Sequence, residues 1–223
     1  MPARSLRAVP GAGLVAAALL ALAGCGSASA PSPPSGVDGL VIPTPYPDPA
    51  DFVAGVDNPW FPLVPGTRWE YDDDPATPAT RIVVEAIPGP EVAGVATTTR
   101  VWTGVDGTST RDHFAQDRAG NVWWFGRAGE WTAGDGGAEA GLAMPATPRV
   151  GDGFRPAFAP GVTATVATVE EVAASVEVPL ASYDDAVLLE VDDGTLSRTE
   201  AYVRGIGLVR TDEAGLVEFD EPR

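Results

Sequence analysis

Apolar and polar residues follow one another in short runs over most of the chain. In segments such as Thr67–Tyr71 and Ala173–Val178, apolar and polar side chains alternate, a period typical of strands with one buried face. No window of a dozen residues within the domain shows sustained apolar spacing of three and four, so no α-helix is predicted there. Strands are predicted at Thr67–Tyr71, Thr80–Ile87, Val92–Thr103, Thr108–Gln116, Val122–Gly126, Val162–Val169, Ala173–Val178, Ala186–Val191, Leu196–Val203, Gly207–Arg210 and Leu216–Phe219.

Turn residues separate these runs at close intervals. Asp117-Arg118-Ala119-Gly120-Asn121 and Asp192-Asp193-Gly194 are typical of hairpin turns, whereas Thr132–Pro160, rich in Gly and Pro, is expected to be a long irregular connection. Sequential strands at this spacing favour an antiparallel meander. We therefore expect an all-β fold in a single domain, as a curved sheet or incomplete barrel, with a two-sheet β-sandwich as the alternative.

The first residues have the three zones of a secretory signal. Arg4 and Arg7 precede an apolar run, Gly13–Ala23, which is too short to span a membrane as a helix because spanning needs roughly twenty residues. The tetrad Leu22-Ala23-Gly24-Cys25 that follows resembles the lipobox of bacterial lipoproteins. The alternative is cleavage further on, at Ser27-Ala28-Ser29-Ala30, which would leave no lipid.

Cys25 is the only cysteine of the chain and cannot form an internal disulfide. The resemblance implies that its thiol carries acyl chains such as palmitate, and stable anchoring requires more than one chain. We expect residues 1–24 to be a cleaved signal peptide, 25–50 a Pro- and Ser-rich tether, and 51–223 the β-rich domain. The expected location is the extracytoplasmic face of the cell membrane, with membrane lipid as the partner of acylated Cys25.

The net charge of the chain limits the classes of molecule that it can bind. The 223 residues have 31 acids against 14 basic residues, a net charge of −17, and removal of residues 1–24 with their two arginines would make it −19. Affinity for nucleic acids rests on basic side chains that neutralise phosphates, so nucleic acid is excluded as a partner. Every one of the 14 basic residues is arginine, which excludes Schiff-base chemistry on lysine and a P-loop.

Aromatic residues supply the candidate ligand site. Trp123 and Trp124 are neighbours on a predicted strand, so they point to opposite faces and cannot both enter one core. One of them is expected to line a groove near His113, the sole histidine, although burial of both faces by protein explains the pair equally well. Catalysis by His113 is not expected, because adjacent Asp112 would point to the opposite face and no Gly-x-Ser-x-Gly elbow is present.

Clustered acids are the remaining reactive groups. They occur at Asp72-Asp73-Asp74, Asp117–Asn121, Asp184-Asp185 and Asp192-Asp193, and none matches an EF-hand loop. Solvated turns explain most of them, and the sequence leaves open whether calcium binds there. No cofactor and no catalytic or metal-ligating residue is assigned.

Several segments resemble a family of uncharacterised exported bacterial proteins. They are Asp57-Asn58-Pro59-Trp60-Phe61-Pro62-Leu63, Pro65-Gly66-Thr67 with Trp69, Ala115-Gln116-Asp117, Gly120–Gly126, Met144-Pro145-Ala146, Gly151-Asp152, and Tyr202 with Gly205–Val209. The resemblance covers nearly the whole domain and implies a single folded unit, without an activity.

These observations favour an envelope lipoprotein whose non-catalytic β-domain binds a ligand or an envelope protein. The alternative is a hydrolase that acts on envelope polymers through paired carboxylates. That reaction would require two acids converging in a cleft, with the pKa of one raised by its surroundings.

The lipid anchor can be tested directly. Cys25→Ala removes the only thiol that can be acylated, so we expect the variant to move from the membrane fraction to the soluble fraction on ultracentrifugation. Retention of the variant on membranes washed with high salt would contradict the lipoprotein interpretation.

Overall fold

The computed structural model describes residues 48–72 and 81–222. Cys25, the predicted signal peptide and all but the last residues of the predicted tether lie outside these ranges. All the described residues belong to one compact unit, residues 36–223. No helix in the described ranges is long and apolar enough to cross a membrane.

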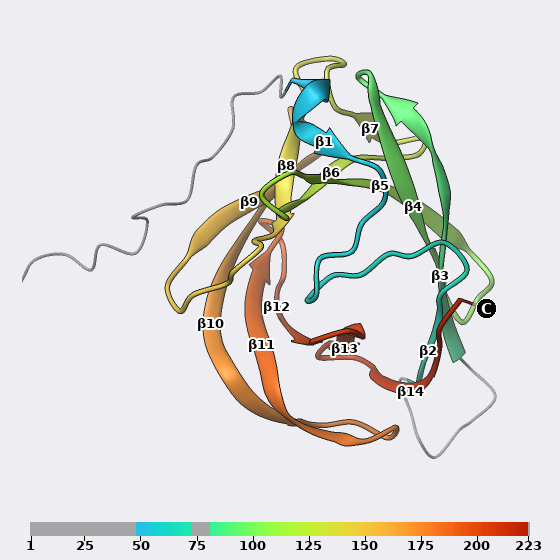
Figure 1. The fold of residues 1–223 in the computed structure, drawn as a ribbon, viewed down its shortest axis with the longest axis vertical. Coiled ribbons are helices and arrows are strands. Elements are labelled where there is room, and N and C mark those ends of the chain that lie inside the picture. The colour runs from blue at the N-terminus through green and yellow to red at the C-terminus, as the bar shows by residue number, and fades with distance from the viewer. Residues whose placement is uncertain (1–47, 73–80, 223) are drawn as a thin grey trace, which may run out of the picture. The chain divides into compact units, whose positions relative to one another are not determined.

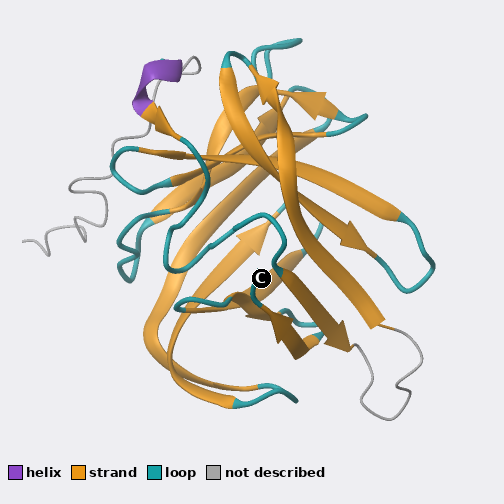
Figure 2. Ribbon diagram, turned by 45° about the vertical axis from the view of Figure 1, so that its right-hand side comes forward, coloured by secondary structure: helices purple, strands orange, loops and turns teal. Residues whose placement is uncertain are grey.

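The fold is all-β, as the sequence predicts, and 60% of the residues are in strands. Figure 2 shows strands throughout the domain, with one short helical turn near its start. The elements are η1 (Pro49–Asp51), β1 (Phe52–Val53), β2 (Arg68–Asp72), β3 (Arg81–Val92), β4 (Val95–Thr103), β5 (Ser109–Asp117), β6 (Val122–Arg127), β7 (Trp131–Thr132), β8 (Glu139–Met144), β9 (Gly153–Ala159), β10 (Thr163–Glu177), β11 (Ser182–Asp192), β12 (Ser197–Val203), β13 (Gly207–Arg210) and β14 (Gly215–Asp220).

Twelve of these strands form a closed antiparallel barrel. Each strand pairs with its neighbour in sequence from β2 to β6 and from β8 to β14, β6 pairs with β8, and β14 pairs with β2. The last pairing joins Leu216 to Tyr71 and Phe219 to Trp69. The meander is therefore confirmed, but the barrel is closed and not incomplete, because the first and last strands of the meander bond to each other. Because the strands form one closed sheet, the alternative of a two-sheet β-sandwich is wrong.

The stretch predicted as an irregular connection, Thr132–Pro160, contains the paired strands β8 and β9. Their approach depends on Gly141, where a Cβ atom would lie 2.2 Å from the carbonyl oxygen of Pro156. Small residues gave these strands a weak hydrophobic signal. A second difference concerns the predicted strands Val162–Val169 and Ala173–Val178, which form the single long strand β10. Ala173, within this strand, has a positive φ of 56° and lies in a region where the pairing with β11 shifts register.

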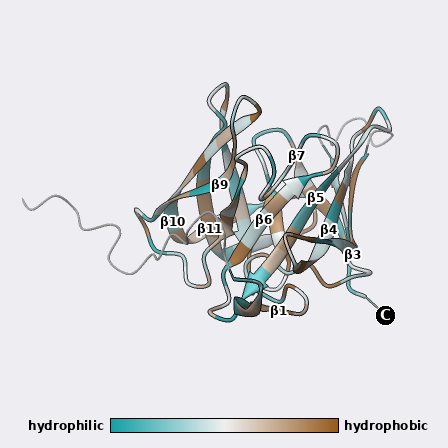
Figure 3. Ribbon diagram, turned by 90° about the horizontal axis from the view of Figure 1, so that it is seen from above, coloured by the Kyte–Doolittle hydropathy of each residue, from teal (hydrophilic) through white to brown (hydrophobic). Residues whose placement is uncertain are grey.

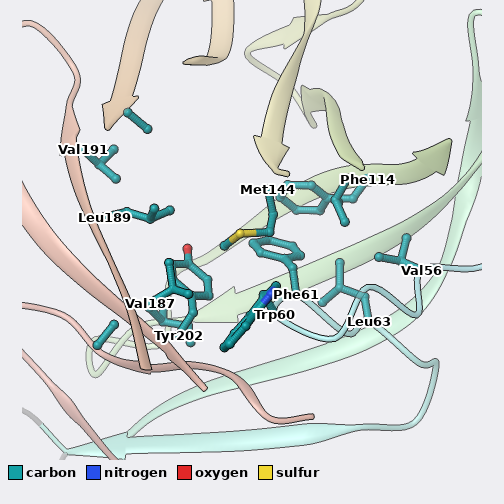
Figure 4. Packing of buried hydrophobic residues seen from close by; sticks show 14 of the residues in the cluster. Val56, Trp60, Phe61, Leu63, Phe114, Met144, Val187, Leu189, Val191 and Tyr202 are labelled. Atoms are coloured by element: carbon teal, nitrogen blue, oxygen red, sulfur yellow. The ribbon is translucent and has the colours of Figure 1, made fainter. Parts of the chain in front are cut away.

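Residues 54–66, between β1 and β2, enter the barrel and are called the plug segment below. Figure 1 shows this blue-to-cyan stretch crossing between the strands β10 and β11 on one side and β3 and β4 on the other. Val56, Trp60, Phe61 and Leu63 are all buried in the main core. In Figure 4, Trp60 and Phe61 lie between Tyr202 on one side and Phe114 with Met144 on the other. The core is therefore built partly from a loop and not from strands alone.

Asn58 fixes the plug segment in place. Its side-chain amide donates to the carbonyl oxygens of Gly120 at 2.8 Å and Pro145 at 3.3 Å, and its Oδ1 accepts from the backbone N–H groups of Trp60 and Phe61. The residue is 1% exposed. Asn58 thus joins the plug segment to the β5–β6 turn and to the end of β8.

Further bonds tie the plug segment and β2 to the β12–β13 turn. The backbone N–H of Gly205 donates to the carbonyl oxygen of Pro59, and the Trp69 indole donates to that of Ile206. Residues 57–63 and Trp69 therefore contact the β5–β6 turn, the residue after β8 and the β12–β13 turn.

We expect Asn58→Ala to lower the free energy of unfolding by at least about 2 kcal/mol, because buried donors and acceptors would lose their partners. Urea unfolding followed by tryptophan fluorescence measures this change. Glu91→Ala, at an exposed position of β3, is the matched control and should shift stability by less than about 0.5 kcal/mol. Equal effects of the two substitutions would show that the Asn58 bonds do not hold the plug segment.

Candidate ligand cavity

The barrel strands and the turns beside them line an open cavity of about 510 Å³, several of whose lining residues are exposed to solvent. Strands β4, β5 and β6 supply one wall, and β12, β13 and the turns beside them supply the other. The cavity is lined by Arg100, Trp102, Thr110, Asp112, Arg127, Leu196, Ser197, Arg198, Glu200, Leu208, Thr211, Asp212 and Glu213. Its volume lies within the roughly 300–1,000 Å³ of sites that hold small molecules.

Asp112 is the most deeply buried charge in this wall, with a side chain only 2% exposed. Its carboxylate accepts from Arg127 Nε at 2.7 Å and Nη2 at 3.4 Å, and from Arg100 Nη2 at 3.3 Å. Burial would lower the pKa of Arg127, but its hydrogen bond and charge attraction to Asp112 raise that pKa above its usual value. The paired charges compensate one another, as a buried carboxylate requires.

Glu200 is the matching acid on the opposite wall. It accepts from Arg198 Nε at 2.8 Å and from the Tyr202 hydroxyl at 2.6 Å. Burial, and then the Glu200 charge, raise the pKa of Tyr202 well above its ordinary value, although Arg100 opposes this shift. Tyr202 therefore remains a neutral hydrogen-bond donor at physiological pH.

The Arg100 guanidinium lies over two aromatic rings that line the smaller spaces beside the cavity. Its Cζ is 5.5 Å from the ring centroid of Phe61, in the plug segment, and 5.0 Å from that of Phe114. The two rings lie 5.1 Å apart, and Phe61 also stacks on Tyr202. Below Arg100 the free spaces are small, about 20 Å³ on one side and 80 Å³ on the other.

Of the three residues proposed from the sequence for ligand binding, Trp124 faces the barrel interior. It lines the 80 Å³ space together with Arg127, whose Cζ lies 5.2 Å from its ring centroid. Its indole also contacts Phe114 and Trp131, at centroid distances of 5.9 and 5.3 Å. Trp124 does not line the 510 Å³ cavity, and its role in ligand binding stays a prediction.

Trp123 and His113 do not line the cavity. Trp123 is 2% exposed, and its indole donates to Asp117 Oδ2 at 2.9 Å. His113 lies on the face of β5 opposite to buried Asp112, as alternation requires, and its Nδ1 is 2.9 Å from Thr99 Oγ1. Both faces of the sheet are therefore covered at Trp123.

Two of the acidic turns that the sequence singles out are hydrogen-bonded locally, whereas Asp184 and Asp185 lie within β11, where Asp184 accepts from the Ser175 hydroxyl of β10. Asp193 Oδ1 accepts from the backbone N–H groups of Thr195 and Leu196, and Asp192 accepts from that of Gly194. Asp117 accepts from Asn121. Asp73 and Asp74 lie outside the described ranges, and within those ranges no group of three potential ligand residues could hold a metal ion.

The charged residues of the cavity were not assigned from the sequence, although it contains a signal for them. Arg198, Glu200 and Tyr202 are two residues apart on β12, so they share one face. Asp112 and Phe114 on β5 have the same spacing, as do Arg100 and Trp102 on β4. Charged residues that lie on the same strand face as aromatic residues indicate a polar lining inside a barrel.

The titration of His113 gives a direct test of its environment. Burial lowers the pKa of His113 below 6.5, and the smaller attraction of Asp112 does not offset this. Because it is the only histidine, its ring Hε1 resonance should appear singly in NMR spectra and titrate with a midpoint below 6.5.

The same shift implies that the free energy of unfolding falls as the pH drops through 6.5 towards the lower folded-state pKa, because the unfolded chain binds the proton first. His113→Gln should remove this part of the pH dependence. The reference is the titration of His113 in the urea-unfolded chain, where the midpoint should be about 6.5. A folded-state midpoint at or above that of the unfolded chain would contradict the described position of the ring.

Comparison with known proteins gives no relative. No protein-family model, no curated protein and no solved structure matches this chain.

Proposed function

We propose that this protein is a non-catalytic binding protein of the cell envelope that holds a small molecule inside its β-barrel. The observation that carries the proposal is the 510 Å³ cavity, whose two walls carry paired charges together with Trp102, Leu196 and Leu208. A cavity with a few convergent polar groups on a mostly apolar scaffold is the usual form of a small-molecule site.

The division of the barrel interior supports this proposal. The plug segment fills one end with Val56, Trp60, Phe61 and Leu63, whereas the other end is left open and lined by charges. Charged residues inside a barrel do not improve stability over well-packed apolar ones. Their presence at the unfilled end is consistent with selection for binding.

The arrangement of the carboxylates favours binding over the hydrolase alternative. Asp112 and Glu200 both face the cavity, but each is paired with arginine, and Glu200 also accepts a hydrogen bond from Tyr202. They are held as hydrogen-bond acceptors, whereas acid catalysis on envelope polymers needs a carboxyl group that donates a proton.

The membrane anchor belongs to the same proposal. A lipid on Cys25, followed by a Pro-rich tether, would keep the barrel at the outer face of the membrane, where solutes of the envelope can enter it. Proline-rich chain is semi-rigid and spans about 3 Å per residue, so it would hold the domain away from the bilayer.

The test is a thermal-shift screen of the full chain carrying Cys25→Ala, which keeps the protein free of lipid. The panel contains calcium, sugars, small organic acids and lipids. A compound that binds only the folded state raises the melting temperature, by an amount that grows with concentration.

Thr110→Trp supplies the decisive comparison, because Thr110 lines the cavity and a bulky ring there would block it. Thr199→Trp is the matched control, since Thr199 is exposed on β12 between the inward-facing Arg198 and Glu200. We expect the hits to be lost in Thr110→Trp and kept in Thr199→Trp. Shifts that survive Thr110→Trp would place binding outside the barrel and overturn the proposal.

A further inference from the structure

The guanidinium of Arg100 has donors that no protein group uses. Its only hydrogen bond to a described residue is the 3.3 Å contact from Nη2 to Asp112, and its buried Nε has no partner. A buried polar atom without a partner is uncommon in folded proteins and calls for an explanation. Arg100 lines the 510 Å³ cavity and both smaller spaces, so a group bound where these spaces meet would face its guanidinium.

Arginines outnumber carboxylates only where the 510 Å³ cavity meets the 80 Å³ space, because the whole larger cavity has four carboxylates against three arginines. Both spaces are lined by Arg100, Arg127, Arg198 and Glu200, and the carboxylate of Asp112 lies beside two of these arginines. Asp112 is shared between two of the arginines, whereas Glu200 is paired with the third. In a chain with a net charge of −17, a concentration of arginines inside a barrel indicates recognition of an anion.

Two further acids restrict the charge of that anion. Asp212 and Glu213, in the β13–β14 turn, line the 510 Å³ cavity but neither of the two smaller spaces. They would repel a molecule that carries several negative charges. Arg100, whose one ion pair to a described residue is the 3.3 Å contact with Asp112, and these two acids together fit a ligand with one acidic group.

The shape of the interior sets the position of the rest of the ligand. The spaces of about 20 and 80 Å³ below Arg100 cannot take a long chain. The 510 Å³ cavity provides Trp102, Leu196 and Leu208 as apolar contacts. An acidic group at Arg100 therefore leaves the apolar part of the molecule in this larger space.

We infer that the cavity binds a compact amphipathic organic anion with a single acidic group, which accepts hydrogen bonds from Arg100 while its apolar part lies against Trp102 and Leu208. This inference rests on the proposed function and names the class of its ligand. Arg100 is the residue that determines specificity, because it alone combines a buried unpartnered donor with contact to all three spaces.

Two fluorescent probes of nearly the same shape test the inference. 8-Anilinonaphthalene-1-sulfonate carries one anionic group, and N-phenyl-1-naphthylamine is the same ring system without it. With the full chain carrying Cys25→Ala, we expect the sulfonate to bind at least about tenfold more tightly, because it gains charge-assisted hydrogen bonds. The readout is probe fluorescence, with energy transfer from tryptophan as a second signal.

Arg100→Gln should weaken the sulfonate about tenfold or more and leave the neutral probe within about twofold. Arg155→Gln removes the same charge from an exposed position of β9 that lines none of these spaces, and should change neither probe. Circular dichroism and thermal melting establish that each variant is folded. The comparison of the two probes on the unsubstituted barrel stands even if Arg100→Gln does not fold.

The outcomes distinguish failure of the anion inference from failure of the proposed small-molecule binding. If the neutral probe binds as tightly as the sulfonate and both are blocked by Thr110→Trp, the cavity binds small molecules but the anion inference is wrong. If neither probe responds to Thr110→Trp, the proposed function fails as well. Unchanged sulfonate binding in folded Arg100→Gln would also overturn the assignment of Arg100.

Discussion

A closed barrel of twelve strands is wider than its own inward-facing side chains can fill. Barrels of about eight strands are just filled by their side chains, and wider ones enclose space that something else must occupy. In this protein the space is divided. The plug segment occupies one end, with Trp60 and Phe61 packed against Phe114 and Tyr202, and the other end remains a cavity of about 510 Å³.

The plug segment and the cavity are coupled through Phe61. Asn58 fixes the segment by bonds to Gly120 and Pro145, and the ring of Phe61 is thereby placed under the guanidinium of Arg100. The chain thus uses a loop to fill part of the barrel and also to place an aromatic ring against Arg100, which lines the candidate site. Aromatic rings beneath a guanidinium attract its charge while they leave its in-plane donors available. Figure 3 shows hydrophilic and hydrophobic residues interleaved along the strands, as expected where the two faces of a strand have different surroundings.

Burial of the interior charges would destabilise the fold if they were not paired through hydrogen bonds. Asp112 and Glu200 each receive hydrogen bonds from arginine, whose planar group offers several donors and stays charged when buried. A lysine has fewer ways to satisfy a buried carboxylate. The arginine-only composition of the chain therefore suits this interior, although composition gave no indication that three arginines lie inside the barrel.

Much of the fold follows from local sequence, whereas the site depends on distant contacts. The strands β2, β4, β5, β6 and β12 begin and end within a few residues of their predicted limits, because alternation and turn residues act over short distances. β8 and β9 were missed because Ala, Gly and Pro give weak local signals and their pairing depends on the close approach at Gly141. Alternation predicted that Trp123 and Trp124 point to opposite faces without saying which one points inward, whereas Arg100, Arg127 and Arg198 looked like ordinary surface charges on separate strands.

The sequence by itself determined the strand-and-turn order, the lack of a predicted helix in the domain, the acidic net charge and the expectation of a lipid on Cys25. Each of these depends on residues that are near one another in the chain or on simple counts. Only the tertiary structure decided that β14 pairs with β2, that residues 54–66 enter the barrel, and that three arginines and four acids line one cavity. The physical reason is that strand pairing and inward orientation are set by hydrogen bonds between distant segments, and period-two alternation distinguishes the two faces of a strand without saying which one a closed sheet turns inward.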